Sequence, residues 1–163
     1  MNIYFALGSN LGSRLQNLRN AVNKLHIIGN ITACSDVYET KAWGGVPQPD
    51  YLNACVKVET IRDIDPLELL RTVKRFELEL GRVQSVRWGA RKIDIDILLI
   101  DGMTYHSGEL NIPHISMCYR LFVLVPLGDI LPEMWRHPEN GKSIHEMIES
   151  LKGESRPVRV TGL

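Results

Sequence analysis

The sequence predicts a single α+β domain spanning residues 1–163, with an antiparallel sheet and helices packed on it. Three observations lead to this prediction. Apolar residues follow strand and helix periods in the order β-α-β-β-α-β, and further helical segments come after them. The 163 residues are 44% hydrophobic and 23% charged, which is typical of a globular domain. The chain contains no repeat, low-complexity tract or linker that would mark a domain boundary.

The first half of the chain is expected to contain one helix among its strands. Strands are expected at residues 2–7, 31–40 and 51–60. Ser13 and Gln16 have the spacing of a capping box, which begins a helix between the first two strands. Gly29 is placed to end this helix.

The second half is expected to continue this alternation and then add C-terminal helices. Asp65 and Pro66 are typical of a helix start, and Gly81 is placed to end that helix. Strands are expected at residues 93–100, 103–106 and 157–160, and helices at residues 116–125 and after the Ser143/Glu146 capping box. This order predicts the split βαβ, ferredoxin-like plan, an antiparallel sheet with helices on one face and additional C-terminal helices.

Composition and charge argue against several classes of protein. The formal net charge is zero, so no long-range attraction to nucleic acid or to an anionic membrane is expected. No apolar run is long enough to cross a bilayer, and no basic-then-apolar leader opens the chain. The three cysteines lack metal-binding or redox spacing. We therefore expect a cytoplasmic protein that binds neither nucleic acid nor membrane. A monomer that acts on small molecules is expected as well, although none of these features determines the oligomeric state.

The segment from residue 87 to 100 places two aspartates, Asp94 and Asp96, in an otherwise apolar strand. Residues two apart in a strand share a face, so these carboxylates are expected side by side, about 6.5 Å apart along the strand. The opposite face is expected to carry Ile93, Ile95, Ile97 and Leu99, whereas Leu98 and Ile100 continue the aspartate face.

Two ionised carboxylates on a partly buried surface repel each other unless a cation lies between them. A Mg²⁺ ion bound by Asp94 and Asp96 would remove this repulsion and keep room for substrate phosphates. The preceding segment, residues 82–92, has four cationic residues and no acidic residue, and guanidinium groups match phosphate oxygens. These features indicate a polyphosphate site. The alternative is an edge strand whose aspartates face water beside an ordinary basic loop.

Two further groups of residues have side chains suited to a ligand. His114 precedes a predicted helix, where it would either donate a hydrogen bond to an anion or serve only in packing. Tyr51 and Asn53 share one face of their strand. The asparagine amide suits the edge of a flat heterocycle, and Trp43, Tyr51 or Phe122 could cover its faces.

Several of these motifs follow one another in a fixed order. They are Leu7-Gly-Ser-Asn-Leu-Gly12, Pro49-Asp-Tyr-Leu-Asn53, Glu77 with Gly81-Arg82, Arg87-Trp-Gly-Ala-Arg91 with Asp94 and Asp96, Pro113-His114, and Arg120 with Phe122-Val-Leu-Val-Pro-Leu127. Over nearly its whole length the chain resembles the 6-hydroxymethyl-7,8-dihydropterin pyrophosphokinase family of folate biosynthesis. The resemblance implies transfer of the terminal pyrophosphoryl group of ATP to the hydroxymethyl oxygen of a reduced pterin, with release of AMP.

The resemblance also implies a role for each matching residue. Asp94 and Asp96 would bind two Mg²⁺ ions. The catalytic residues would be Arg82, Arg87, Trp88 and Arg91. ATP would be bound by Glu77, Arg82, Arg87, Trp88, Arg91, Ile97, His114 and Arg120. The pterin would be bound by Thr40, Trp43, Tyr51, Asn53, Trp88, Asp94 and Phe122. Gln84, Ala90, Glu109 and Ile115 depart from residues frequent in that family, which bears on affinity and rate more than on reaction type.

Two other functions fit parts of this pattern. A two-metal nucleotidyl transferase or nuclease also uses paired carboxylates, but it needs an extended basic track that the neutral composition does not supply. An RNA-binding sheet of the RRM type needs aromatic residues on its central strands. Asp94 and Asp96 would instead place negative charge on such a strand.

Overall fold

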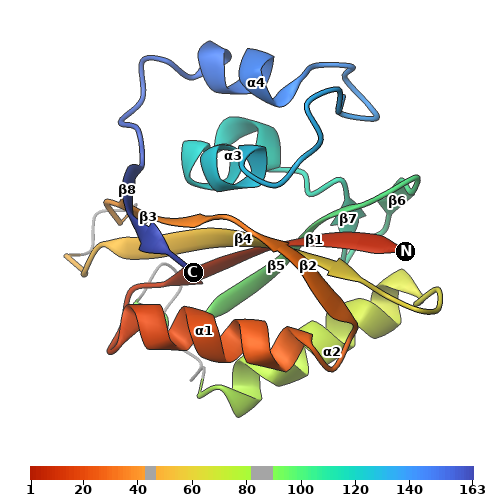
Figure 1. Ribbon diagram of the computed structural model, residues 1–163, viewed down its shortest axis with the longest axis horizontal. Coiled ribbons are helices and arrows are strands. Elements are labelled where there is room, and N and C mark those ends of the chain that lie inside the picture. Colours follow the sequence, from red (N-terminus) through yellow and green to blue (C-terminus); the bar gives the residue numbers. More distant parts are fainter. Residues whose placement is uncertain (43–46, 82–89) are drawn as a thin grey trace.

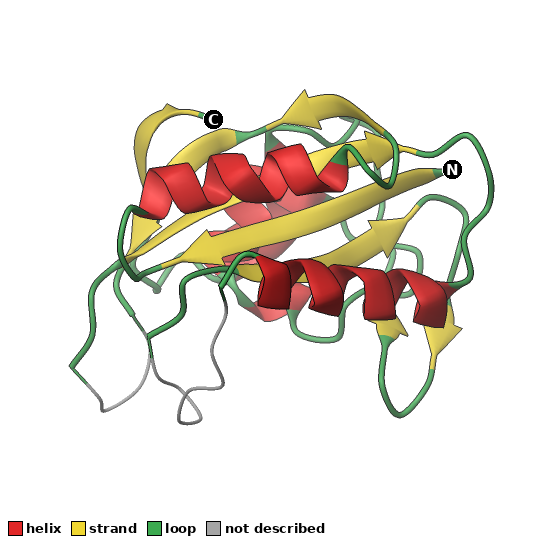
Figure 2. Cartoon of the chain, turned by 90° about the horizontal axis from the view of Figure 1, so that it is seen from below, coloured by secondary structure: helices red, strands yellow, loops and turns green. Residues whose placement is uncertain are grey.

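One central antiparallel sheet lies between two pairs of helices. The computed structural model describes residues 1–42, 47–81 and 90–163. The helices are α1 (Arg14–Leu25), α2 (Pro66–Glu79), α3 (Leu121–Gly128) and α4 (Ile144–Ser150). α1 and α2 lie on one face of the sheet, and α3 and α4 lie on the other (Figures 1 and 2). The predicted antiparallel sheet with helices packed on it is confirmed, but the helices cover both faces of the sheet and not one face as predicted.

Within the described ranges, no helix has both the length and the apolar character needed to span a membrane.

The sheet is built around its two longest strands. Its strands are β1 (Asn2–Ser9), β2 (Asn30–Cys34), β3 (Asp36–Thr40), β4 (Tyr51–Glu59), β5 (Asp94–Ile100) and β8 (Val158–Gly162). The hydrogen-bonded order is β5-β1-β4-β3-β8, and β2 also pairs with β4. All of these ladders are antiparallel. β5 is therefore an edge strand beside β1, and the predicted C-terminal edge strand is found as β8.

Each face of the sheet has its own apolar core, because side chains alternate between the faces. The α1/α2 face includes Phe5, Leu7, Leu18, Leu25, Val56, Leu69, Val73 and Phe76, all nearly inaccessible to solvent. The α3/α4 face includes Tyr4, Cys55, Leu98, Val123, Leu124, Leu127, Ile144 and Met147. These two cores fix the helices on the sheet, since each buried side chain of this size contributes about 1.5–3 kcal/mol.

Helix starts follow the sequence in two places and differ in a third. The Asp65 carboxylate accepts hydrogen bonds from the first backbone N–H groups of α2, and Gly81 follows that helix with φ +90°. The capping box at Ser143 is also present, at the start of α4. The capping box predicted at Ser13 is wrong, because the Ser13 side chain makes no capping hydrogen bond and Gln16 instead donates to Asn20.

Three other elements differ from the sequence prediction. The strand expected at 31–40 is divided at Ser35, whose hydroxyl accepts the Cys55 N–H and ends the β2 register. The segment 103–106 forms β6 (Tyr105–His106), which pairs with β7 (Asn111–Ile112), and only Met103 pairs back to Ile100. The helix expected at 116–125 is a 3-10 turn, Met117–Tyr119, followed by α3, which continues through Pro126.

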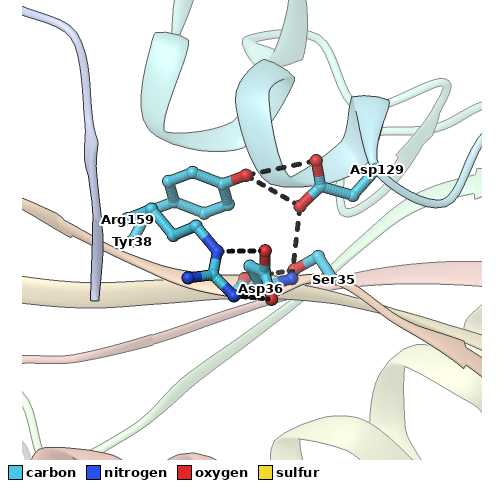
Figure 3. A network of polar contacts seen from close by, with 5 residues as sticks. All are labelled: Ser35, Asp36, Tyr38, Asp129 and Arg159. Atoms are coloured by element: carbon cyan, nitrogen blue, oxygen red, sulfur yellow. Dashed lines mark hydrogen bonds and ion pairs between the residues drawn. The ribbon is translucent and has the colours of Figure 1, made fainter. Parts of the chain in front are cut away.

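A polar network joins α3, β3 and β8 at one edge of the sheet (Figure 3). The Asp129 carboxylate, directly after α3, accepts hydrogen bonds from the Tyr38 hydroxyl at 2.9 and 3.1 Å and from the Asp36 N–H at 3.2 Å. Arg159 of β8 pairs with the Asp36 carboxylate. Burial and the hydrogen bond to Asp129 raise the pKa of Tyr38 to about 12. The network thereby holds the end of α3 against the sheet edge.

Candidate active site

Asp94 and Asp96 lie at the start of β5, on the sheet face that α3 covers. Asp94 stands opposite Gly8 of β1, and Asp96 stands opposite Ala6, which packs with the α3/α4 core. Both aspartates are partly exposed, whereas Ile95 between them is buried in the opposite core. The strand period therefore correctly predicted that the two carboxylates share a face.

The strand period fails further along β5. The β1–β5 ladder shifts register between Tyr4 and Phe5, so that Leu99 lies opposite Tyr4. Such a bulge inserts one extra residue and reverses the faces beyond it. Leu98 and Leu99 both pack in the α3/α4 core, and Ile100 packs in the other core. The faces predicted for Leu99 and Ile100 are therefore wrong.

Arg91 is positioned at the aspartates through both its side chain and its backbone. Its guanidinium donates a hydrogen bond to the Asp94 carboxylate at 3.1 Å. Burial acts to lower the pKa of Arg91, but Asp94 raises it overall, so the group stays cationic. The Arg91 N–H donates to Asn10 Oδ1 at 2.7 Å, and the Asn10 N–H donates to the Arg91 carbonyl at 3.0 Å.

Two predicted site residues lie along the outer edge of β5. Glu77 of α2 is 1% exposed and accepts the Ile95 N–H at 2.7 Å. The His114 N–H donates to the Leu98 carbonyl at 2.8 Å. These contacts satisfy polar backbone groups that an edge strand would otherwise leave open. Ile97 lies between these contacts with its side chain buried, so a ligand at this edge would meet its backbone.

The surroundings of His114 favour its neutral imidazole form. Burial lowers its pKa, and the cationic groups of Arg120 and Lys74 lower it further, against an opposing effect of Asp96. His114 Nδ1 accepts a hydrogen bond from the Ser116 N–H at 3.2 Å. The proton of the neutral ring therefore lies on Nε2, which leaves this atom able to donate to an anion.

The residues predicted to bind a flat heterocycle gather on the aspartate face. Asn53 lies opposite Gly8 on one side, and its Nδ2 donates to Thr40 Oγ1 at 2.8 Å. Gly8 thus separates Asn53 from Asp94, and a Cβ added there would stand 3.4 Å from Asn53 Oδ1 and 3.6 Å from the Tyr51 ring. Phe122 belongs to α3 and packs at the edge of its core. This face therefore combines a position without a side chain at Gly8, the amide of Asn53, and the aromatic rings of Tyr51 and Phe122.

The remaining predicted residues are Arg120 and four residues that the structure does not describe. Trp43, Arg82, Arg87 and Trp88 lie outside the described residues. Arg120 precedes α3, and its guanidinium lies 5.7 Å from the centre of the Phe122 ring. In the described part of the chain, no group of three or more His, Cys, Asp or Glu side chains has metal-binding geometry.

Three residues at the site were not singled out as functional in the sequence. Asn10 belongs to the Leu7–Gly12 motif but was given no role, yet it is fully buried and contacts both Arg91 and the segment before Tyr51. Lys74 pairs with Glu77 at 3.1 Å. Gly8 leaves space between Asp94 and Asn53, because it has no side chain. No local signal marked Asn10, because its partners Gln48 and Arg91 lie 38 and 81 residues away in the sequence.

Comparison with known proteins places the chain beside a family of transferases. The family model for 7,8-dihydro-6-hydroxymethylpterin-pyrophosphokinase matches residues 4–132. A 2-amino-4-hydroxy-6-hydroxymethyldihydropteridine pyrophosphokinase from Synechocystis is 40% identical over 147 residues, covering 89% of this chain and 73% of the relative. The enzyme of the same name from Bacillus subtilis is 38% identical over 154 residues, covering 93% and 91%.

Solved structures of the same kind share the fold. A Plasmodium falciparum HPPK-DHPS structure with pteroate matches with a TM-score of 0.73 at 15% identity, covering 97% of this chain. A second, the A437G form with STZ-DHP, matches with a TM-score of 0.72 at 17% identity, covering 92% of this chain. The chain spans 47% and 45% of those two longer proteins. At these identities the likeness concerns the fold alone.

Proposed function

The chain belongs to the 7,8-dihydro-6-hydroxymethylpterin-pyrophosphokinase family, and we propose that it transfers a pyrophosphoryl group from ATP to 6-hydroxymethyl-7,8-dihydropterin in folate biosynthesis. The products are the pterin diphosphate and AMP. One observation carries the assignment of the site: the carboxylates of Asp94 and Asp96 share a face beside the Arg91 guanidinium, at the end of the cross-strand row Asn53, Gly8 and Asp94.

The reaction exchanges one P–O bond for another. The hydroxymethyl oxygen of the pterin attacks the β-phosphorus of ATP and loses its proton. The bond between the β-phosphorus and the oxygen that bridges to the α-phosphate breaks, and that oxygen leaves with AMP. This chemistry depends on positioning and on stabilisation of negative charge, so no side-chain nucleophile is needed. Arg91 supplies a permanent positive charge for that purpose, and by the family resemblance Arg82 and Arg87 would add to it. Trp88, which is uncharged, would contact the substrates.

The donor set at Asp94 and Asp96 suits Mg²⁺. Two carboxylates with room for phosphate and water oxygens match the preference of this ion, which dehydrates reluctantly. When bound, two Mg²⁺ ions would neutralise charge on the polyphosphate. Asp94 and Asp96 would hold these ions, and their positions two residues apart in β5 keep both side chains on one face of the sheet.

The row on the aspartate face suits the pterin. Asn53 and Thr40, joined by a hydrogen bond, would read the polar edge of the ring. Tyr51 and Phe122 would cover the two faces of the heterocycle, with Trp43 from the family resemblance. The absence of a side chain at Gly8 lets a planar ring lie flat between Asn53 and Asp94. The hydroxymethyl group would then be directed toward the aspartates.

The outer edge of β5 suits the nucleotide. Ile97 would present backbone groups to a base, because alternate residues of an edge strand direct their N–H and C=O groups outward. His114 Nε2 would donate to a phosphate, and Arg120 would add positive charge close by. Glu77 holds this edge in place through Ile95. ATP and pterin would thus meet at Asp94 and Asp96 from two sides.

The ferredoxin-like plan is part of this proposal. The order β5-β1-β4-β2, with α1 and α2 as the two connections on one face, supports a split βαβ core. In that description, β3, β8, α3 and α4 are additions to the core. The additions supply Thr40 and Phe122, which is why the site lies where the added α3 meets the sheet.

Analysis of the nucleotide products tests this function. Purified protein with ATP, Mg²⁺ and 6-hydroxymethyl-7,8-dihydropterin should form AMP only when the pterin is present. Asp96→Asn should lower the rate by about 100-fold or more, because the metal site loses a charge. Thr60→Val, at the far end of β4, should keep the wild-type rate. Formation of ADP, or no nucleotide turnover by folded protein, would refute the proposal.

A further inference from the structure

Asn10 connects the two halves of the candidate site. It is 0% exposed and directly follows β1, between the strands that carry Asp94 and Asn53. Its side chain makes three hydrogen bonds, to Arg91 on one side and to Gln48 and Pro49 on the other. These partners are far from Asn10 in sequence, so no regular element would otherwise place them together.

The contacts with Arg91 restrain the backbone of that residue on both sides of its Cα atom. Asn10 Oδ1 accepts the Arg91 N–H at 2.7 Å, and the Asn10 N–H donates to the Arg91 carbonyl at 3.0 Å. Two hydrogen bonds to one residue restrain both its position and its orientation. The Arg91 guanidinium then reaches Asp94 at 3.1 Å. The orientation of the Arg91 guanidinium toward Asp94 therefore depends on Asn10.

The contacts on the other side fix the start of β4. Asn10 Nδ2 donates to Gln48 Oε1 at 2.9 Å and to the Pro49 carbonyl at 3.1 Å. Pro49 is two residues before Tyr51, the first residue of β4 and a predicted pterin contact. The amide of Asn10 uses its acceptor on the phosphate side and both donors on the pterin side. No other uncharged side chain of this length offers that combination.

We infer that Asn10 is a positioning residue that sets Arg91 and the Tyr51 segment in register, and so aligns the phosphate and pterin halves of the site. This inference rests on the proposed function. In-line transfer is sensitive to such alignment, because a displacement of about 1 Å lowers the rate by roughly 100-fold. Asn10 touches neither substrate in this account, so its effect is transmitted by Arg91 and by the 48–49 backbone.

A double-mutant cycle on the single-turnover rate of AMP formation tests this inference. Asn10→Ala should lower that rate by about 10- to 100-fold in the wild-type background. In the Arg91→Ala background the same substitution should lower the rate by a clearly smaller factor, because the guanidinium that Asn10 positions is gone and only its contacts with residues 48 and 49 are still lost. Labelled ATP with enzyme in excess keeps the slow Arg91→Ala rate measurable. Circular dichroism establishes that each variant is folded.

Two further variants keep the test decisive. Gln48→Met removes one partner of Asn10 while keeping its length, and its loss of rate should likewise shrink in the Arg91→Ala background. It replaces Asn10→Ala if that variant does not fold. Thr60→Val removes a buried hydroxyl that donates to the Arg62 carbonyl at 2.7 Å, far from the site, and controls for general destabilisation. Its rate should match wild type.

The outcomes separate this inference from the proposed function. Equal losses of rate in both backgrounds, or no loss in either, would overturn the role of Asn10 while wild-type AMP formation leaves the function intact. Absence of AMP formation by the wild-type protein would refute the function itself. A clearly larger loss in the background that contains Arg91 would support the positioning role.

Discussion

Glu77 stabilises the edge strand that carries the aspartates, and its removal has a cost that the structure allows us to work out. Its carboxylate is 1% exposed and accepts the Ile95 N–H at 2.7 Å. A charge-assisted hydrogen bond of this kind contributes about 1.5–3 kcal/mol. The Lys74 ion pair adds at most about 0.5 kcal/mol, because the Lys74 side chain is 48% exposed. Glu77→Ala should therefore lower the free energy of unfolding by about 2–3 kcal/mol.

Urea unfolding followed by circular dichroism measures this change directly. Glu77→Gln keeps an oxygen acceptor for the Ile95 N–H and should lose only about 1 kcal/mol. Glu68→Ala, an exposed glutamate on the same helix, is the matched control and should change stability by less than about 0.5 kcal/mol. In thermal unfolding, Glu77→Ala should lower the Tm by about 4–12 °C. A stability of Glu77→Ala within about 0.5 kcal/mol of wild type would refute the structural role of Glu77.

Three other features lead to separate predictions. The Tyr4 hydroxyl is buried without a hydrogen-bond partner among the described residues. In urea unfolding, Tyr4→Phe should therefore leave the free energy of unfolding unchanged or raise it by up to about 1 kcal/mol. A decrease of that size would contradict this prediction. Hydrogen bonds to Asn111 and Glu139 raise the pKa of His106. A raised pKa stabilises the fold at acidic pH, and this contribution is lost as the pH rises through the folded-state pKa. The decrease in Tm caused by His106→Asn should therefore be larger near about pH 5 than near about pH 9. An equal decrease at both pH values would contradict this role of His106. Iodoacetamide should modify exposed Cys34 much faster than Cys55, whose burial raises its pKa; equal labelling in mass spectra would disprove this burial.

Periodicity and capping signals predicted most elements because they are local. The strand period placed Asp94 and Asp96 on one face, and the Asp65 cap and Gly81 marked both ends of α2. The period failed at Leu98, where a bulge arises from the pairing of β5 with β1. A bulge depends on the partner strand, so the sequence of one strand does not reveal it.

The candidate site was predicted in its residue types but not in its connections. Charged and aromatic residues are visible in the sequence, and the family resemblance gave each of them a role. Asn10 was missed because its partners, Gln48 and Arg91, become neighbours only when the sheet forms. The edge position of β5, which gives Glu77 its partner, likewise follows from the strand order and not from local sequence.

The most direct test of the central claim follows the phosphorus atoms of ATP. ATP labelled at the β-phosphate is incubated with the protein, Mg²⁺ and 6-hydroxymethyl-7,8-dihydropterin, and the products are separated. Pyrophosphoryl transfer predicts that the β-label moves to the pterin product in step with AMP formation. Label that stays in ADP while the pterin gains only the γ-phosphate would contradict the account.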